Sequence, residues 1–229
     1  MKLIKFFFLA FAVFCVTQPL SAKKITVHVV PENAKIYCNG DEVGSGIYEI
    51  NFGRKDDFVM LKFTAPGYIS RSVKLFKKNP KNTVSYQLAE DLALKNSVGA
   101  ESGMDLANRN FTITCKQGMT PDVVWKRLMN IAINNFENIE IRDQSAGWIR
   151  TAWAKTRFAS GDERQEVRTR LEIRLQFAGE GELAYRVKLT SEIAEGDCYS
   201  EECFVPYDRL LKKYENIISE LQTTLGANY

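Results

Sequence analysis

The sequence has few of the residues from which active sites and metal sites are usually built. Its 229 residues include one histidine, His28, which excludes most metal sites and Ser-His-Asp triads. Basic and acidic side chains nearly balance, 31 against 28, so no bulk charge points to nucleic acid. After the first 22 residues, no apolar run approaches the length of a membrane-spanning helix. We therefore expect no enzyme activity, metal, cofactor or nucleic-acid partner, and no transmembrane segment in the mature chain.

The first 22 residues have the pattern of a secretory signal peptide. Lys2 and Lys5 precede eleven apolar residues, 6–16, and the small residue Ala22 comes just before Lys23. Eleven residues rise about 16 Å as a helix, too short for a hydrocarbon core of about 30 Å. We predict export to the periplasm or cell envelope, with cleavage near Ala22.

Four cysteines remain after that cleavage, and an oxidising compartment makes disulfides the default. Cys198 and Cys203 are separated by four polar residues that can form a turn, so we predict a local bridge between them. A zinc site is the rival, but it needs four ligands and the chain has a single histidine. Cys38 and Cys115 either pair across a domain boundary or remain buried thiols, and the sequence leaves both alternatives open.

The composition divides the mature chain into two domains, which together predict an α+β protein. Residues 23–103 have ten lysines and two arginines, whereas residues 104–229 have six lysines and eleven arginines. Glycine and polar residues interrupt any periodicity near the change. The predicted segments are a signal peptide (1–22), a small all-β sandwich (23–90), a linker (91–108) and an α+β domain (109–229).

The first domain has the pattern of a small β-sandwich. Strands are predicted at residues 24–30, 34–38, 58–63, 70–76 and 83–88, with six or seven strands in all. Turn residues recur every 8–12 positions between them, as in sandwich folds. Asn39-Gly40 is one such turn, and residues 65–68 are another. His28 lies in the first strand without a partner nearby in sequence, so we assign it no chemistry.

Short motifs in this domain resemble those of PEGA domains. They are Pro31-Glu32-Asn33-Ala34, Ile36, Asn39-Gly40, Gly44, the turn Ala65-Pro66-Gly67-Tyr68 and the closing pattern Val84-x-Tyr86-x-Leu88. The resemblance covers about residues 24–90. It implies a β-sandwich accessory module of envelope proteins, without fixed catalytic or binding residues.

The second domain alternates between helix and strand signals. Thr120 and Pro121 begin a helix, and residues 148–158 are predicted to form one long strand. Apolar and polar residues alternate through 167–177 and 185–193, which predicts an antiparallel hairpin around residues 179–181 with one buried face. A closing helix is predicted over residues 206–225. The order predicts an antiparallel sheet gripped on one face by two helices.

This order, together with Gly147-Trp148-Ile149-x-Thr151, resembles the helix-grip domains of the BamC-like lipoproteins. The resemblance covers about residues 110–225. It implies an accessory role in outer-membrane barrel assembly.

The outward positions of the predicted hairpin are rich in cations and form the candidate binding residues. These are Arg168, Arg170 and Arg174, then Arg186 and Lys188, with Arg150 added if Ile149 and Trp153 face inward. Guanidinium groups suit carboxylates and phosphates. The interpretation that we favour is a solvated face, partly neutralised by Glu172 and Glu192. The alternative is a binding face for an anionic partner.

The predicted function is that of an exported, non-enzymatic envelope protein, a binding or assembly accessory with a PEGA-like domain. Its partners would be envelope proteins or anionic envelope polymers. The alternative is a periplasmic carrier of a small apolar or anionic ligand, held in a cavity beneath the C-terminal helix. Trp125, Trp148 and Trp153 are candidates for lining such a cavity, although core packing is the interpretation that we favour.

Overall fold

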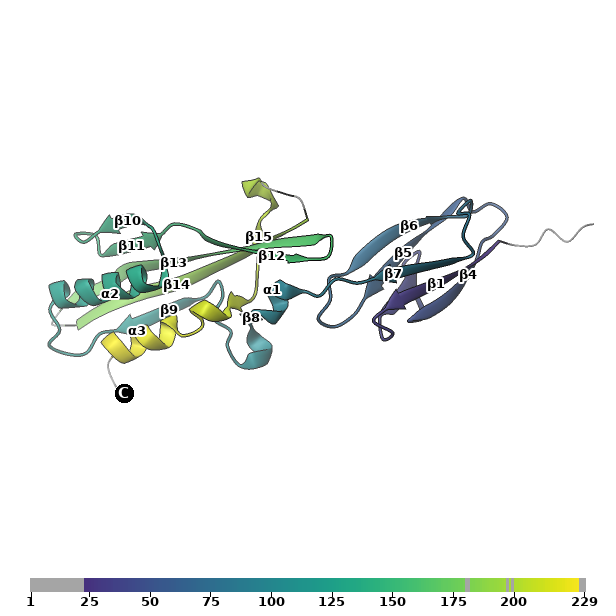
Figure 1. Cartoon of the computed structure of the whole chain (residues 1–229). Coiled ribbons are helices and arrows are strands. Elements are labelled where there is room, and N and C mark those ends of the chain that lie inside the picture. Colours follow the sequence, from purple (N-terminus) through teal and green to yellow (C-terminus); the bar gives the residue numbers. More distant parts are fainter. Residues whose placement is uncertain (1–22, 180–181, 197, 199, 227–229) are drawn as a thin grey trace, which may run out of the picture. The chain divides into compact units, whose positions relative to one another are not determined.

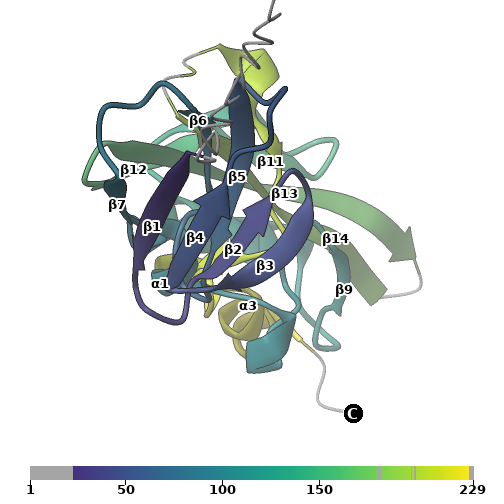
Figure 2. The same cartoon turned by 90° about the vertical axis from the view of Figure 1, so that its right-hand side faces the viewer.

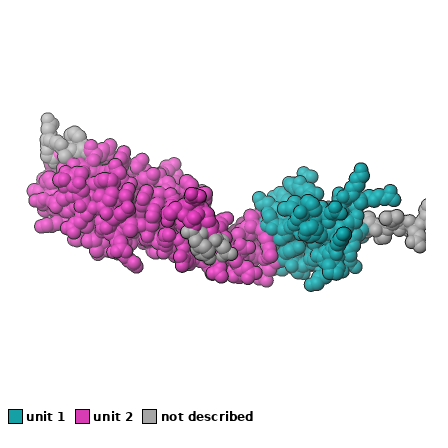
Figure 3. All heavy atoms as spheres, turned by 90° about the horizontal axis from the view of Figure 1, so that it is seen from above, with its two compact units in different colours: residues 1–63, 72–86 teal, residues 64–71, 87–229 magenta. Residues whose placement is uncertain are grey.

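The computed structural model describes residues 23–179, 182–196, 198 and 200–226, so the predicted signal peptide lies outside the described residues. The chain is rich in strands and forms two compact units, coloured separately in Figure 3. Unit 1 consists of residues 1–63 and 72–86, and unit 2 of residues 64–71 and 87–229. No helix in the described part of the chain is long and apolar enough to cross a membrane.

Unit 1 contains two sheets, whose strands are seen in front in Figure 2. One sheet has the order β4 (Ile47–Asn51), β1 (Lys24–Val30), β7 (Thr83–Gln87). The other has the order β3 (Asp41–Ser45), β2 (Lys35–Cys38), β5 (Phe58–Thr64), β6 (Arg71–Phe76). The predicted strands are therefore present to within one or two residues, and β3 and β4 lie between them.

Alternation along the strands gives each sheet of unit 1 one buried face. Ile25, Val27 and Val29 of β1 are buried, as are Val59, Leu61 and Phe63 of β5. The intervening residues are half-buried or exposed, as expected when a strand with a period of two covers a core on one side only.

The two predicted turns of unit 1 have the required backbone geometry. Asn39 and Gly40 connect β2 and β3 with φ angles of 52° and 103°, the left-handed conformation that Asn-Gly tolerates. In the second turn the Tyr68 amide donates to the Ala65 carbonyl at 3.1 Å, and Gly67 has φ of 79°.

Unit 2 is built around a seven-stranded sheet (Figure 1). Its main path is β10 (Ile139–Asp143), β11 (Trp148–Thr151), β13 (Glu163–Gly179), β14 (Glu182–Glu195), β15 (Val205–Pro206). In addition, β12 (Ala154–Ser160) pairs with β13, and β9 (Asn110–Thr114) pairs with β14. The predicted hairpin is confirmed by the antiparallel pairing of β13 with β14, although residues 180–181 of its turn lie outside the described residues.

The register of β13 and β14 shifts once, near the hairpin tip. Leu175 lies opposite Tyr185, but Phe177 lies opposite Ala184, so Gln176 forms a β-bulge. The Gln176 side chain accepts a hydrogen bond from Thr112 Oγ1 of β9 at 3.1 Å.

Two helices of unit 2 pack on the apolar face of this sheet. Helix α2 (Pro121–Asn135) begins as predicted, with the Thr120 hydroxyl accepting from the Val123 amide and proline in the first turn. Helix α3 (Ile217–Leu225) packs against α2 and β9. The shared core includes Val124, Leu128 and Ala132 of α2, Ile218, Leu221 and Leu225 of α3, and Leu171, Ile173, Val187 and Leu189 of the sheet.

The closing helix is shorter than predicted, because it begins at Ile217 rather than near residue 206. Before it, β16 (Leu210–Leu211) pairs with β8 (Ser97–Val98), and the Lys212 amide donates to the Asn96 carbonyl. The apolar residues of this segment have the spacing of a helix, but the backbone groups of residues 210–212 form hydrogen bonds with the distant residues 96–98 instead. Leu210 and Leu211 are both buried in that arrangement.

Residues 91–108, expected to form a linker, lie in unit 2 instead. They form α1 (Leu92–Lys95), β8 and a short 3₁₀ turn, η1 (Ala100–Ser102). Asp91 caps α1 by accepting from the Leu94 amide at 2.8 Å. Ala93, Val98 and Ala107 are buried in the core of unit 2, so three small apolar residues in a polar stretch hold this segment in place.

The predicted long strand over residues 148–158 is divided into β11 and β12, which pair in succession with β13. At the break the Thr151 hydroxyl, rather than a backbone carbonyl, accepts from the Leu171 amide at 3.0 Å. The Ala152 amide donates to the Asn138 carbonyl outside this pairing. Alternation from Ile149 along one continuous strand would place Trp153 on the inward side of the sheet. The break interrupts this alternation, so Trp153 does not lie on that side.

A prediction follows for the turn before β11. Gly147 has φ of 59°, and a Cβ there would lie 2.5 Å from Leu175 Cβ; Gly161 has φ of 58° with open space around it. We expect Gly161→Ala to lower the free energy of unfolding by about 1–2 kcal/mol. Gly147→Ala should lower the free energy of unfolding by about 1–3 kcal/mol more than Gly161→Ala does, because Leu175 must move. Chemical denaturation of both variants measures the difference, and equal losses would contradict the close packing of Gly147.

Candidate binding face of the large sheet

The six predicted cations lie on one face of the unit 2 sheet, opposite the helices. On β13, Leu171 and Ile173 are fully buried and alternate with the cationic positions; on β14, Val187 and Leu189 do the same. We call this the outer face. It contains Arg150 of β11, Arg168, Arg170 and Arg174 of β13, and Arg186 and Lys188 of β14.

The pairing register brings these residues into rows across the sheet. Arg174 lies between Trp148 and Arg186, so two arginines are direct cross-strand neighbours. In the next row Glu172 lies between Arg150 and Lys188. Like charges directly opposite each other are unfavourable unless other groups compensate them. The partners of each cation therefore decide what the face can bind.

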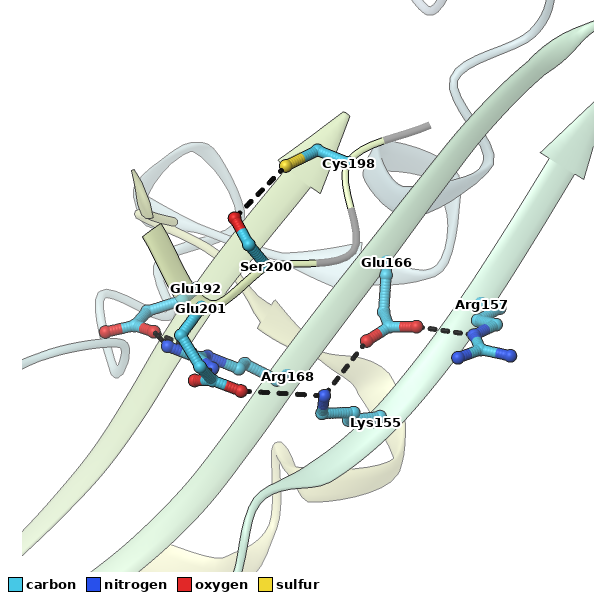
Figure 4. Close-up of polar contacts among 8 residues, drawn as sticks. All are labelled: Lys155, Arg157, Glu166, Arg168, Glu192, Cys198, Ser200 and Glu201. Atoms are coloured by element: carbon cyan, nitrogen blue, oxygen red, sulfur yellow. Dashed lines mark hydrogen bonds and ion pairs between the residues drawn. The ribbon is translucent and has the colours of Figure 1, made fainter. Parts of the chain in front are cut away.

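One end of the outer face is occupied by a chain of six charged side chains with alternating sign (Figure 4). In order, they are Arg157, Glu166, Lys155, Glu201, Arg168 and Glu192. They come from β12, β13 and β14 and from the 3₁₀ turn η2 (Glu201–Cys203). Three cations and three carboxylates cancel, so this end presents no net charge of its own.

Arg168 is the most buried member of this charged chain and is only 6% exposed. Its guanidinium lies 2.7 Å from Glu192 and is also ion-paired with Glu201. The ring of Trp153 lies 4.4 Å from it and that of Phe204 3.9 Å, both within cation–π range. Arg168 was expected among the exposed binding residues. Its burial and its internal partners make it a structural residue that attaches η2 to the sheet.

The predicted disulfide is confirmed. Cys198 and Cys203 are bonded, with their Cα atoms 6.0 Å apart. The bridge closes the loop that contains η2, and within this loop Glu201 reaches back to Arg168. The disulfide therefore closes this loop on itself, and the ion pair with Arg168 attaches the loop to the sheet.

The other two cysteines are free thiols, which resolves the alternative that the sequence left open. Cys115 is buried in unit 2 and Cys38 is half-buried in unit 1. Burial raises the pKa of both thiols, with Asp41 adding to the effect at Cys38. Both groups therefore stay in the less reactive thiol form.

Two carboxylates of the charged chain have pKa values below their usual range. A hydrogen bond from Arg157 lowers the pKa of Glu166, and the charge of Lys155 lowers it further. Arg168 has the same effect on the pKa of Glu201, chiefly through a hydrogen bond. These directions indicate that the network stabilises the ionised carboxylates.

Two of the three tryptophans lie on the outer face rather than in the core. Trp148 has the guanidinium of Arg174 4.3 Å from its ring centroid and that of Arg150 at 5.7 Å, and Trp153 has Arg170 at 4.3 Å. The prediction that the tryptophans pack in the core is correct only for Trp125, which is 5% exposed. Trp148 could have been placed from its alternation with buried Ile149, whereas the break that moves Trp153 has no sequence signal that we recognise.

The remaining cations differ in whether an acid pairs with them. Arg150 makes two hydrogen bonds to Glu140, at 2.9 and 3.2 Å, and Arg174 is paired with Glu172. The other three, Arg170, Arg186 and Lys188, have no ion pair among the residues that the structure describes. We call these the unpaired cations. Arg170 is the most constrained, because its Nε is buried and no described atom accepts its hydrogen bond.

A pocket of about 370 Å³ lies at one side of Trp153. It is lined by the last residues of α2 and those that follow, by the β11–β12 break and by the segment before α3, including Asn135, Asn138, Trp153, Lys155, Lys213 and Tyr214. No residue of α3 lines it. The apolar side of α3 is filled instead: Ile217, Ile218, Leu221 and Leu225 are 0–4% exposed.

The described residues include no group of three or more His, Cys, Asp or Glu side chains placed to hold a metal ion. His28 is half-buried on β1, where it pairs with Ile47 of β4.

Removing the buried cation of the charged chain should destabilise unit 2. Arg168→Met leaves Glu192 without its cation and leaves Glu201 with only the more distant Lys155, and we expect a loss of about 3 kcal/mol in the free energy of unfolding. Arg109→Met is the matched control, since Arg109 and Asp105 form an exposed pair that should contribute less than about 1 kcal/mol. Urea denaturation followed by tryptophan fluorescence compares them. A loss at Arg168 no larger than that at Arg109 would show that the charged chain adds no stability.

The pKa of Glu166 predicts how this stability depends on pH. Because the folded state lowers that pKa, the contribution of Glu166 is present above its unfolded value of about 4.3 and is lost as the pH falls below it. The stability difference between the wild type and Glu166→Gln should therefore shrink from about pH 5 downward. Arg157→Gln should also make the free energy of unfolding depend less steeply on pH in this range, because it removes the main cause of the lowered pKa of Glu166. A difference that stays constant to pH 3 would contradict this assignment.

Comparison with known proteins identifies no family for this chain: no protein-family model matches it, and no significantly similar curated protein is found.

Proposed function

We propose that this chain is an exported, non-enzymatic cell-envelope protein that acts as a binding or assembly accessory. In this proposal unit 1 is a PEGA-like β-sandwich and unit 2 is a helix-grip domain. The outer face of unit 2 binds an anionic partner, either an acidic envelope protein or an anionic envelope polymer.

Two observations support export. The first 22 residues have the basic, apolar and small-residue pattern of a signal peptide. The Cys198–Cys203 bridge belongs to a type that persists in oxidising compartments and is uncommon in the cytosol. Export also argues against nucleic acid as the anionic partner.

The observation that carries the binding proposal is the contrast between paired and unpaired cations on one face. Arg150, Arg168 and Arg174 each have a carboxylate partner, whereas no described acid pairs with Arg170, Arg186 or Lys188. Arg186 also lies directly opposite Arg174, which is unfavourable in the free protein. An acidic partner would remove that repulsion and supply the missing acceptors.

The surroundings of the unpaired cations suit such a partner. Arg186 and Lys188 are two residues apart on β14, about 6–7 Å, which is close enough for one anionic segment to reach both. Their neighbours on β9 are Thr112 and Asn110, and Thr190 lies opposite Arg170. These neutral side chains can add hydrogen bonds without competing for the cations, and Glu172, which lies opposite Lys188, is already paired with Arg174.

The packing of α3 supports the accessory role over the carrier alternative. A carrier needs a cavity beneath this helix, but four of its side chains fill that space. The pocket beside Trp153 is polar at its rim, with lysine and asparagine side chains, and so does not suit a small apolar ligand.

The proposal is tested by comparing two triple variants as bait in pull-downs from envelope extract. Arg170→Gln, Arg186→Gln and Lys188→Gln together remove the unpaired cations while keeping length and polarity. We expect this variant to fold normally and to recover at least about tenfold less partner, because three charge-assisted contacts are lost. Wild-type recovery should also fall between about 0.05 M and 0.5 M salt.

The matched control is Arg109→Gln with Lys116→Gln and Lys126→Gln, which removes the same charge elsewhere in unit 2. Its recovery should equal that of the wild type. Circular dichroism checks the fold of both variants. If both variants recover the same partner as the wild type, the outer face is only solvated surface and the binding proposal is wrong.

A further inference from the structure

One end of unit 1 gathers three segments that are far apart in the sequence. The Phe52 amide donates to the Lys23 carbonyl at 3.0 Å, which joins the start of β1 to the loop before β5. The Lys77 amide donates to the Asp57 carbonyl at 2.8 Å, which joins that loop to the one after β6. We call this the loop end of unit 1: residues 23, 52–57 and 77–82.

The loop end is strongly cationic. Its positive side chains are Lys23, Arg54, Lys55, Lys77, Lys78 and Lys81, against the carboxylates of Asp56 and Asp57. Asp56 is partly used within its own loop, since its side chain accepts from the Gly53 amide at 2.8 Å. Lys24, close by on β1, is already paired with Glu49. The excess of positive charge is therefore confined to these loops and is not cancelled there.

Two large aromatic side chains are exposed at the strand ends that adjoin these loops. Phe58 is the first residue of β5 and Phe76 the last of β6, and they are 41% and 51% exposed. Their ring centroids are 6.0 Å apart. The Lys74 ammonium lies 3.6 Å from the Phe58 centroid. The two rings lie on the outer side of β5 and β6, away from the core that Val59 and Leu75 enter.

We propose that the loop end of unit 1 binds the surface of a bilayer that contains anionic phospholipids. Clustered lysines are attracted to anionic headgroups, and aromatic rings beside them fit the boundary between headgroups and acyl chains. A free phosphate would leave the two exposed phenylalanines unused, whereas a lipid surface takes both these rings and the cations of the adjoining loops. This surface is separate from the outer face of unit 2 and does not depend on the function proposed for it.

The test is co-sedimentation of the mature chain, residues 23–229, with vesicles. We expect binding to phosphatidylcholine vesicles that contain about a third phosphatidylglycerol, and little binding to phosphatidylcholine alone. Lys55→Gln, Lys78→Gln and Lys81→Gln together should weaken the partition at least about tenfold. Phe58→Ser with Phe76→Ser should weaken it too, and should remove the part of the binding that remains at high salt.

Two controls make the result specific to the loop end. Lys62→Gln, Lys116→Gln and Lys126→Gln remove the same charge elsewhere and should bind vesicles as the wild type does. The unit 2 variant with Arg170, Arg186 and Lys188 changed to Gln should also bind normally. Absence of binding to anionic vesicles, equal binding to both vesicle types, or a loss in either control as large as in the loop-end variant would overturn the proposal.

Discussion

The antiparallel pairing of β13 with β14 is the interaction on which unit 2 depends. Its alternation sends Leu171, Ile173 and Val187 toward α2 and α3 and sends the cations to the opposite side. One ladder of hydrogen bonds therefore creates both the core and the outer face. The strands β9, β11 and β12 attach along its two edges, so their positions follow from the same register.

Features that follow from local periodicity could be predicted from the sequence. The strands of unit 1, the cap of α2 and the hairpin of unit 2 rest on alternation or on turn residues such as Asn39-Gly40. The disulfide was predictable because its cysteines are five residues apart. Five of the six candidate cations also lie where alternation predicts, half-buried or exposed on the outer face.

Features that depend on distant partners could not be predicted. The segment at Leu210 and Leu211 has helical spacing, but its backbone pairs with residues 97–98, more than 100 positions earlier. Arg168 is identical in sequence pattern to Arg170, yet Glu201 and Phe204 cover the first and not the second. That difference depends on where the disulfide loop folds back, which no local pattern encodes.

The bulge at Gln176 has a consequence for insertions and deletions in this chain. Because side chains alternate with a period of two, one residue added between Gln165 and Leu175 would exchange the apolar and cationic sides of everything beyond it. The bulge adds one residue to β13 only, and on β14 the alternation continues past it, so that Leu183 still enters the core of unit 2. An extra residue is therefore accommodated at one point of β13, while the rest of the two strands must keep its residue count.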